Sequence, residues 1–83
     1  MIVRIRVKLF AILREKAGVA ELELELPEGA TVGNAVAALG ERIPAIRESL
    51  DSVAFAVNRS YAGLTAILKD GDELAAIPPV SGG

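Results

Sequence analysis

The chain has 83 residues, of which 52% are hydrophobic and 24% charged, and its formal net charge is −2. That length suits one small domain with a single hydrophobic core, and the composition excludes intrinsic disorder. The slight acidic excess disfavours nucleic-acid binding, and no apolar run approaches the roughly 20 residues that span a bilayer. The opening residues also lack a signal-peptide pattern, so we expect a soluble cytoplasmic protein that binds neither nucleic acid nor membranes.

The chain contains neither cysteine nor histidine. It therefore lacks a thiol nucleophile, an imidazole base and the usual ligands of zinc, copper and iron–sulfur clusters. Its aspartates and glutamates occupy alternating or turn positions, so a two-carboxylate hydrolase is disfavoured. We expect a function other than side-chain catalysis, with no metal and no other cofactor bound by this chain.

Two strands are predicted near the N-terminus because apolar and polar residues alternate there. Over residues 2–10, one face carries Val3, Ile5, Val7 and Leu9, and the other carries Arg4, Arg6, Lys8 and Phe10. Residues 21–26 alternate glutamate with leucine, and the stretch around residues 14–18 is expected to connect the two strands as a hairpin. The outward cations would then face the outward glutamates, each pair contributing roughly 0.2–1 kcal/mol.

A helix is predicted after the second strand, which ends at Pro27-Glu28-Gly29. Thr31 is a suitable N-cap, and apolar residues then recur at helical spacing at Val32, Ala35, Val36 and Leu39. Gly40 and Pro44 indicate that the helix ends by about residue 43. A looser turn follows, anchored by Ile46 and Leu50.

The remaining pattern predicts a strand over residues 53–57, a turn at residues 58–60, a stronger turn at Asp70-Gly71-Asp72, and a last strand over residues 73–77. Three apolar residues are expected to fill the irregular link, namely Leu64, Ile67 and Leu68. Two carboxylates without further oxygen ligands fit a turn better than a metal site. The element order predicts an α+β, ubiquitin-like β-grasp fold, with a mixed sheet of four to five strands crossed by one main helix.

The chain closes with a thin segment, Pro78-Pro79-Val80-Ser81-Gly82-Gly83. We expect residues 1–77 to form the β-grasp domain and residues 78–83, here called the tail, to extend from it. The prolines stiffen the base of the tail, and the glycines leave its tip without side chains. The free α-carboxylate of Gly83 is therefore the candidate reactive group. The alternative is an idle, frayed terminus.

A docking surface is expected at the base of the tail. The first and last strands of a β-grasp sheet are parallel neighbours, so Phe10 and Ile77 should lie close together as an apolar patch. Tyr61 either extends this patch or packs beneath a loop. Arg14 either holds a partner carboxylate or is only solvated.

Three segments resemble the small subunit of molybdopterin synthase: residues 7–15 (VKLFAILRE), 57–61 (VNRSY) and 68–83. The most specific element is the ending D-G-D-E-L-A-A-I-P-P-V-S-G-G, in which a turn, a strand and the tail occur in fixed register. The sulfur carrier of the thiamine pathway shares the fold and the Gly-Gly end, but it looks like a shorter chain without Pro-Pro-Val-Ser. This chain departs from its molybdopterin relatives at Ala75-Ala76, where bulkier residues are familiar.

The resemblance implies a sulfur carrier in molybdenum cofactor biosynthesis. A ubiquitin-activating-like adenylyltransferase would use ATP to adenylate the Gly83 carboxylate, which a sulfur donor would convert to a thiocarboxylate. The tail would then enter the large subunit, which carries catalysis, and donate sulfur to a cyclic pterin precursor within a complex of two small and two large subunits. Alternatives are a sulfur carrier for thiamine or cysteine biosynthesis, a ubiquitin-like modifier joined through Gly83 to lysines, and a plain interaction module.

Overall fold

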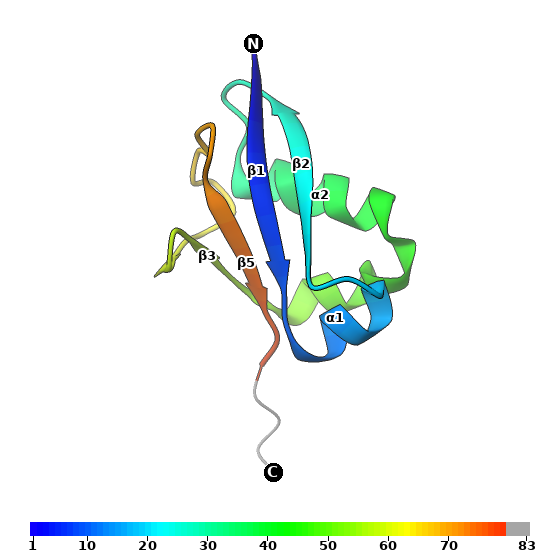
Figure 1. The fold of residues 1–83 in the computed structure, drawn as a ribbon. Coiled ribbons are helices and arrows are strands. Elements are labelled where there is room, and N and C mark those ends of the chain that lie inside the picture. The colour runs from blue at the N-terminus through cyan, green and yellow to red at the C-terminus, as the bar shows by residue number, and fades with distance from the viewer. Residues whose placement is uncertain (80–83) are drawn as a thin grey trace.

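The computed structural model describes residues 1–79, and the tail residues 80–83 lie outside the described part. Five strands form one mixed sheet in the order β2-β1-β5-β3-β4 (Figure 1). The elements are β1 (Ile2–Leu9), α1 (Ala11–Ala17), β2 (Glu21–Pro27), α2 (Val32–Arg42), the 3-10 turns η1 (Pro44–Ile46) and η2 (Glu48–Ser52), β3 (Ala54–Val57), β4 (Ser60–Tyr61) and β5 (Glu73–Ile77).

The strand directions match the predicted fold. β1 pairs antiparallel with β2 and parallel with β5, and β5 pairs antiparallel with β3. α2 crosses one face of the sheet, and the other face is left without helices (Figure 1). The prediction of an α+β, β-grasp arrangement is therefore confirmed.

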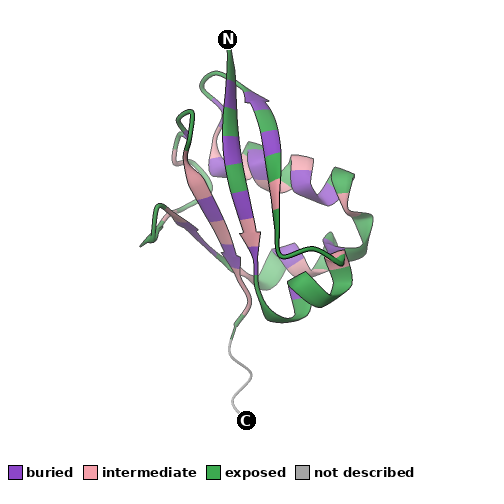
Figure 2. Cartoon of the chain, viewed as in Figure 1, coloured by how far each residue is buried: buried purple, intermediate pink, exposed green. Residues whose placement is uncertain are grey.

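The core lies between the sheet and α2, and the alternation along each strand decides which side chains enter it (Figure 2). β1 contributes all four of its predicted inward residues, each at most 7% exposed. The other strands and α2 add large apolar side chains, including Leu24, Leu26, Val32, Leu39, Phe55 and Leu74. Among residues 1–79 no polar or charged residue is buried.

Helix α2 begins at a capping box, as Thr31 predicted. The backbone N–H of Asn34 donates to the Thr31 hydroxyl over 3.2 Å, and the Thr31 N–H donates to the Asn34 side-chain oxygen over 2.9 Å. The helix ends at Arg42, because the residue before Pro44 is disfavoured in helical conformation. Beyond it, Ile46 and Leu50 are buried as expected.

The connection between β1 and β2 differs from the prediction, because it contains the seven-residue helix α1. So short a helix is marginal by itself and shows little periodicity, so tertiary contacts must hold it. Leu13 is fully buried in the core. Gly18 ends the helix in the left-handed conformation, φ 78°, with its N–H donating to the Arg14 carbonyl over 2.9 Å.

The expectation that three apolar residues fill the link before β5 is right only for Leu68. That residue is 1% exposed, whereas Leu64 and Ile67 are 56% and 64% exposed. The link runs extended past the start of α2, where the Leu68 N–H donates to the Ala30 carbonyl over 2.8 Å. In an extended segment neighbouring side chains face opposite ways, so Ile67 points outward when Leu68 points inward.

The helices found among residues 1–79 are all too short or too polar to cross a bilayer.

Candidate functional site

The base of the tail lies where β1 and β5 end side by side. The two strands are parallel, with Leu9 in register with Ala76, so the next residues along each strand are Phe10 and Ile77. Pro78 then follows and cannot donate a backbone hydrogen bond to the sheet, which limits further strand pairing. The predicted tail residues Val80, Ser81, Gly82 and Gly83 lie outside the described residues, so the site is built from the base of the tail.

Beside this base, the helix-free face of the sheet is hollowed into a groove of about 340 Å³, here called the tail-base groove. Its lining residues come from β1, β3, β4, β5 and the turns next to them: Lys8, Phe10, Ala56, Arg59, Tyr61, Glu73, Ala75 and Ile77. The structure thus brings Phe10, Tyr61 and Ile77 to one surface.

The aromatic side chains of this groove are open to solvent. Phe10 is 43% and Tyr61 is 78% exposed, so neither packs beneath a loop. Ile77, at the end of β5, is half-buried and lines the same groove. Exposed rings beside a half-buried aliphatic residue are the composition that protein interfaces favour at their centres.

The backbone holds Phe10 at this rim. Phe10 keeps an extended conformation at the end of β1, and its carbonyl accepts the N–H of Leu13 over 3.0 Å. The chain then turns at Ala11, whose φ of 50° is unusual for a residue with a Cβ. Because Leu13 is fixed in the core, this turn aims the Phe10 side chain outward instead of inward.

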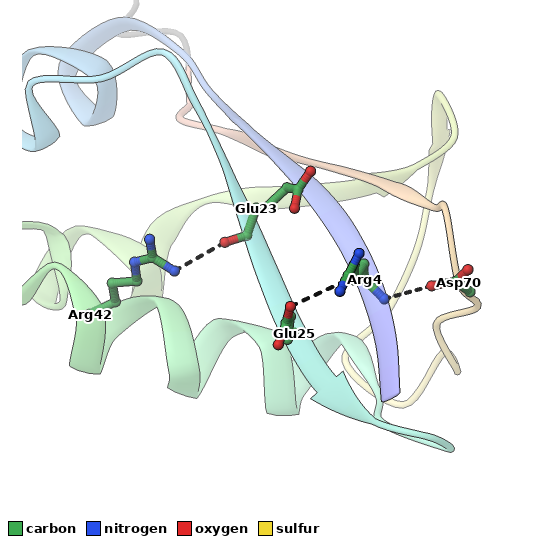
Figure 3. Close-up of polar contacts among 5 residues, drawn as sticks. All are labelled: Arg4, Glu23, Glu25, Arg42 and Asp70. Carbon is green, nitrogen blue, oxygen red and sulfur yellow. Dashed lines mark hydrogen bonds and ion pairs between the residues drawn. The ribbon is translucent and has the colours of Figure 1, made fainter. Parts of the chain in front are cut away.

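The charges of the sheet pair differently from the sequence prediction at one position. Arg4 contacts Glu25 over 3.1 Å, as expected across β1 and β2 (Figure 3), and Arg6 reaches Glu21 over 2.9 Å. Lys8, expected to pair with β2, instead contacts Glu73 over 3.2 Å. The cause is the diagonal reach of Arg6, which takes the glutamate opposite Lys8. These exposed pairs each contribute about 0–1 kcal/mol and neutralise the cationic row.

The Asp70-Gly71-Asp72 turn is structural. The Asp70 carboxylate accepts the Arg4 backbone N–H over 2.8 Å (Figure 3), and Gly71 has a φ of 87° that suits glycine. The two oxygens of Asp72 accept from the Asn58 side chain over 2.9 Å and from the Lys69 N–H over 2.8 Å. Within residues 1–79, no group of three or more acidic side chains is placed to hold a metal ion.

Asn58 and Arg59 form a tight turn between β3 and β4, both with left-handed backbones, φ 50° and 72°. The Asn58 side chain also accepts the Glu73 N–H over 3.0 Å, which ties the turn to the start of β5. Arg59 is thereby presented at the tail-base groove. Arg14, the other candidate, is exposed on α1 and does not line this groove.

The chain is similar to known proteins along nearly its whole length. Residues 7–83 match the model of the ThiS family. The chain belongs to the ThiS family. It is 42% identical over 81 residues to the molybdopterin synthase sulfur carrier subunit of Arabidopsis thaliana, covering 98% of this chain and 84% of that protein. The family resemblance of the sequence is confirmed.

Two solved structures show how closely this ThiS-family fold is shared. A putative molybdopterin converting factor subunit 1 from Pyrococcus furiosus superimposes with a TM-score of 0.87 at 40% identity, covering 94% of this chain and 99% of that one. SAMP1, the small archaeal modifier protein 1 of Haloferax volcanii, gives a TM-score of 0.90 at 36% identity, covering 96% and 99%.

Sequence reasoning missed several groove residues of this ThiS-family chain: Lys8 and Glu73 as a pair, Arg59, and the two alanines Ala56 and Ala75. The alternation of residues 54–57 and 73–77 contained a signal for the alanines, because it places both on the face opposite the core. The presence of Arg59 in the same groove as Lys8 and Phe10 had no such signal, since it depends on pairing between strands far apart in the sequence.

Proposed function

We propose that this chain is the sulfur carrier subunit of molybdopterin synthase and that the Gly83 α-carboxylate carries the sulfur. The observation that supports this most is the similarity along nearly the whole chain to a relative of that name. The position of β5 agrees with it, because Ile77, the last residue before the tail, lines the tail-base groove. The tail therefore starts where a partner can dock.

The chemistry needs activation, because a carboxylate is a poor electrophile. In the proposed sequence, a Gly83 carboxylate oxygen attacks the α-phosphate of ATP in a ubiquitin-activating-like adenylyltransferase, and pyrophosphate leaves. Hydrosulfide released by a sulfur donor then attacks the acyl carbon and AMP leaves, which produces the thiocarboxylate. The thiocarboxylate sulfur finally attacks the cyclic pterin precursor, and water then cleaves the bond between this sulfur and the Gly83 acyl carbon, which releases the Gly83 carboxylate. Two such transfers complete one dithiolene.

The tail is suited to deliver this group. Six extended residues reach roughly 20 Å, enough to pass from the base of the tail into a buried site on another protein. Pro78 and Pro79 restrict the backbone and lower the entropy lost on insertion. Without Cβ atoms, Gly82 and Gly83 fit a narrow path.

We place the catalytic side chains on the large subunit, in a complex of two small and two large subunits. This chain has no cysteine or histidine, and the charges on residues 1–79 lie at the surface. Its contribution is the reactive terminus and the surface that positions it. ATP belongs to the adenylyltransferase, so the carrier binds no cofactor of its own.

Intact mass spectrometry tests the proposal. The chain is co-expressed with its adenylyltransferase and a sulfur-donor enzyme, and a mass increase equal to the exchange of one oxygen for sulfur is expected. The matched control is the same chain with Gly83 deleted, which keeps residues 1–79 and should gain no sulfur. An unchanged mass for the full chain after this treatment contradicts the proposal.

A second candidate is a ubiquitin-like protein modifier, favoured by the close structural match to SAMP1. This function would join Gly83 to lysines of other proteins through isopeptide bonds. Discrete conjugates that survive reducing denaturation, and that disappear on deletion of Gly83, would support it. Sulfur incorporation without conjugates would favour the carrier alone.

A further inference from the structure

The floor of the tail-base groove is made of the smallest side chains on the helix-free face of the sheet. Ala56 and Ala75 lie opposite each other on β3 and β5. Larger residues surround them, with Tyr61 opposite Ala56 on β4 and Lys8 in register with Ala75 on β1. The two alanines therefore leave a hollow between taller walls.

The burial of Ala56 supports this description. Only 5% of Ala56 is exposed, yet it does not belong to the hydrophobic core cluster beneath the sheet. An outward alanine so well covered must be shielded by its taller neighbours.

Charge at the groove is uneven. Lys8 and Glu73 neutralise each other across 3.2 Å. Arg59 lines the same groove, and the ion pairs among the described residues do not include it. The groove therefore has one net positive charge, located at the turn between β3 and β4.

The backbone at Arg59 is in a conformation that arginine disfavours. A φ of 72° costs a residue with a Cβ roughly 1–2 kcal/mol, and glycine is the usual residue at this position of such a turn. The turn is held by Asn58, which bonds to Asp72 and Glu73. Strain retained at a surface site is a reason to look for a function of that side chain.

We propose that the tail-base groove receives one bulky apolar side chain of a partner protein, with a partner carboxylate beside it that meets Arg59. This inference rests on the proposed function, and we take the partner to be the large subunit of molybdopterin synthase. The apolar side chain would fill the hollow over Ala56 and Ala75, between Phe10 and Tyr61. The carboxylate would form a charge-assisted pair with the guanidinium.

The hollow shape of the groove favours a bulky apolar side chain, and the positive charge of Arg59 favours a carboxylate beside it. Stable subunit interfaces concentrate their binding energy in a few large side chains seated in central pockets. An arginine at the rim matches a carboxylate in two parallel hydrogen bonds, which fixes the orientation of the partner. This orientation would direct the tail, which begins at Pro78 directly after Ile77.

The size of the hollow is tested with Ala75→Leu, which fills it. The control is Ala37→Leu, the same change at an exposed position of α2, outside the groove. Isothermal titration calorimetry of the full chain against the purified large subunit should show roughly 10-fold weaker binding or more for Ala75→Leu, and wild-type binding for Ala37→Leu. Circular dichroism checks that both variants fold.

The charge is tested with Arg59→Gly and Arg59→Lys. The glycine variant relieves the backbone, so its thermal midpoint should equal or exceed that of the wild type while its affinity falls roughly 10-fold. The lysine variant keeps the charge and should bind more tightly than the glycine variant. Raising the salt concentration should weaken binding of the wild type more than that of Arg59→Gly.

The outcomes separate this inference from the proposed function. Wild-type affinity of Ala75→Leu, or no binding of the large subunit by the wild type, overturns the inference even if Gly83 still acquires sulfur. Absence of sulfur with the expected binding losses overturns the carrier function alone. Losses confined to self-association or to the adenylyltransferase would place a different occupant in the groove and also overturn the inference.

Discussion

Replacing Leu13 with alanine tests whether the core holds helix α1 and, through it, the base of the tail. Leu13 is fully buried, whereas its neighbour Ile12 on the same helix is 45% exposed. Alanine favours helix at least as well as leucine does, so any loss of stability in Leu13→Ala comes from packing.

The expected loss follows from burial. Removing a fully buried leucine side chain costs about 3–4 kcal/mol, because apolar burial is lost and a cavity remains. Ile12→Ala is the matched control, and since nearly half of that residue stays in water it should cost about 1 kcal/mol. A domain of this kind is stable by about 5–15 kcal/mol, so the first loss is large.

Urea denaturation followed by circular dichroism measures both variants. Leu13→Ala should lose at least 2 kcal/mol more than Ile12→Ala, a difference of roughly 30-fold in the folding equilibrium. Equal losses for the two variants would refute the reasoning, because they would show that α1 contributes little through its buried residue.

Three further changes test other features. Thr31→Ala should cost about 1 kcal/mol by removing the cap of α2, and the exposed Thr65→Ala should cost much less; equal denaturation midpoints would contradict the capping box. Gly71→Ala should cost about 1 kcal/mol or more because its φ is 87°, whereas Gly63→Ala, with no atom within 4 Å of the new Cβ, should change stability by about 0.5 kcal/mol or less. Gly82→Val should keep the thermal midpoint but block adenylation or sulfur transfer, and wild-type transfer in a single-turnover assay would remove the argument for a narrow path.

The sequence alone determined the features that act over a few residues. Alternation identified β1 and β2 and chose their buried faces, because successive side chains of a strand point to opposite sides. Thr31 marked the start of α2, because a cap bonds to backbone only three residues away. The closing D-G-D-E to G-G motif identified the family, which a full-length relative at 42% identity bears out.

Tertiary structure alone decided the features that depend on strand pairing. Seven residues became α1 only because Leu13 reaches a core built by distant segments. Lys8 contacts Glu73, 65 positions along the chain, because β5 inserts beside β1 in parallel register. The tail-base groove arises in the same way, from side chains that are neighbours only once the sheet has closed. Local patterns carry no information on such neighbours, since the free energy that selects them comes from packing the whole domain.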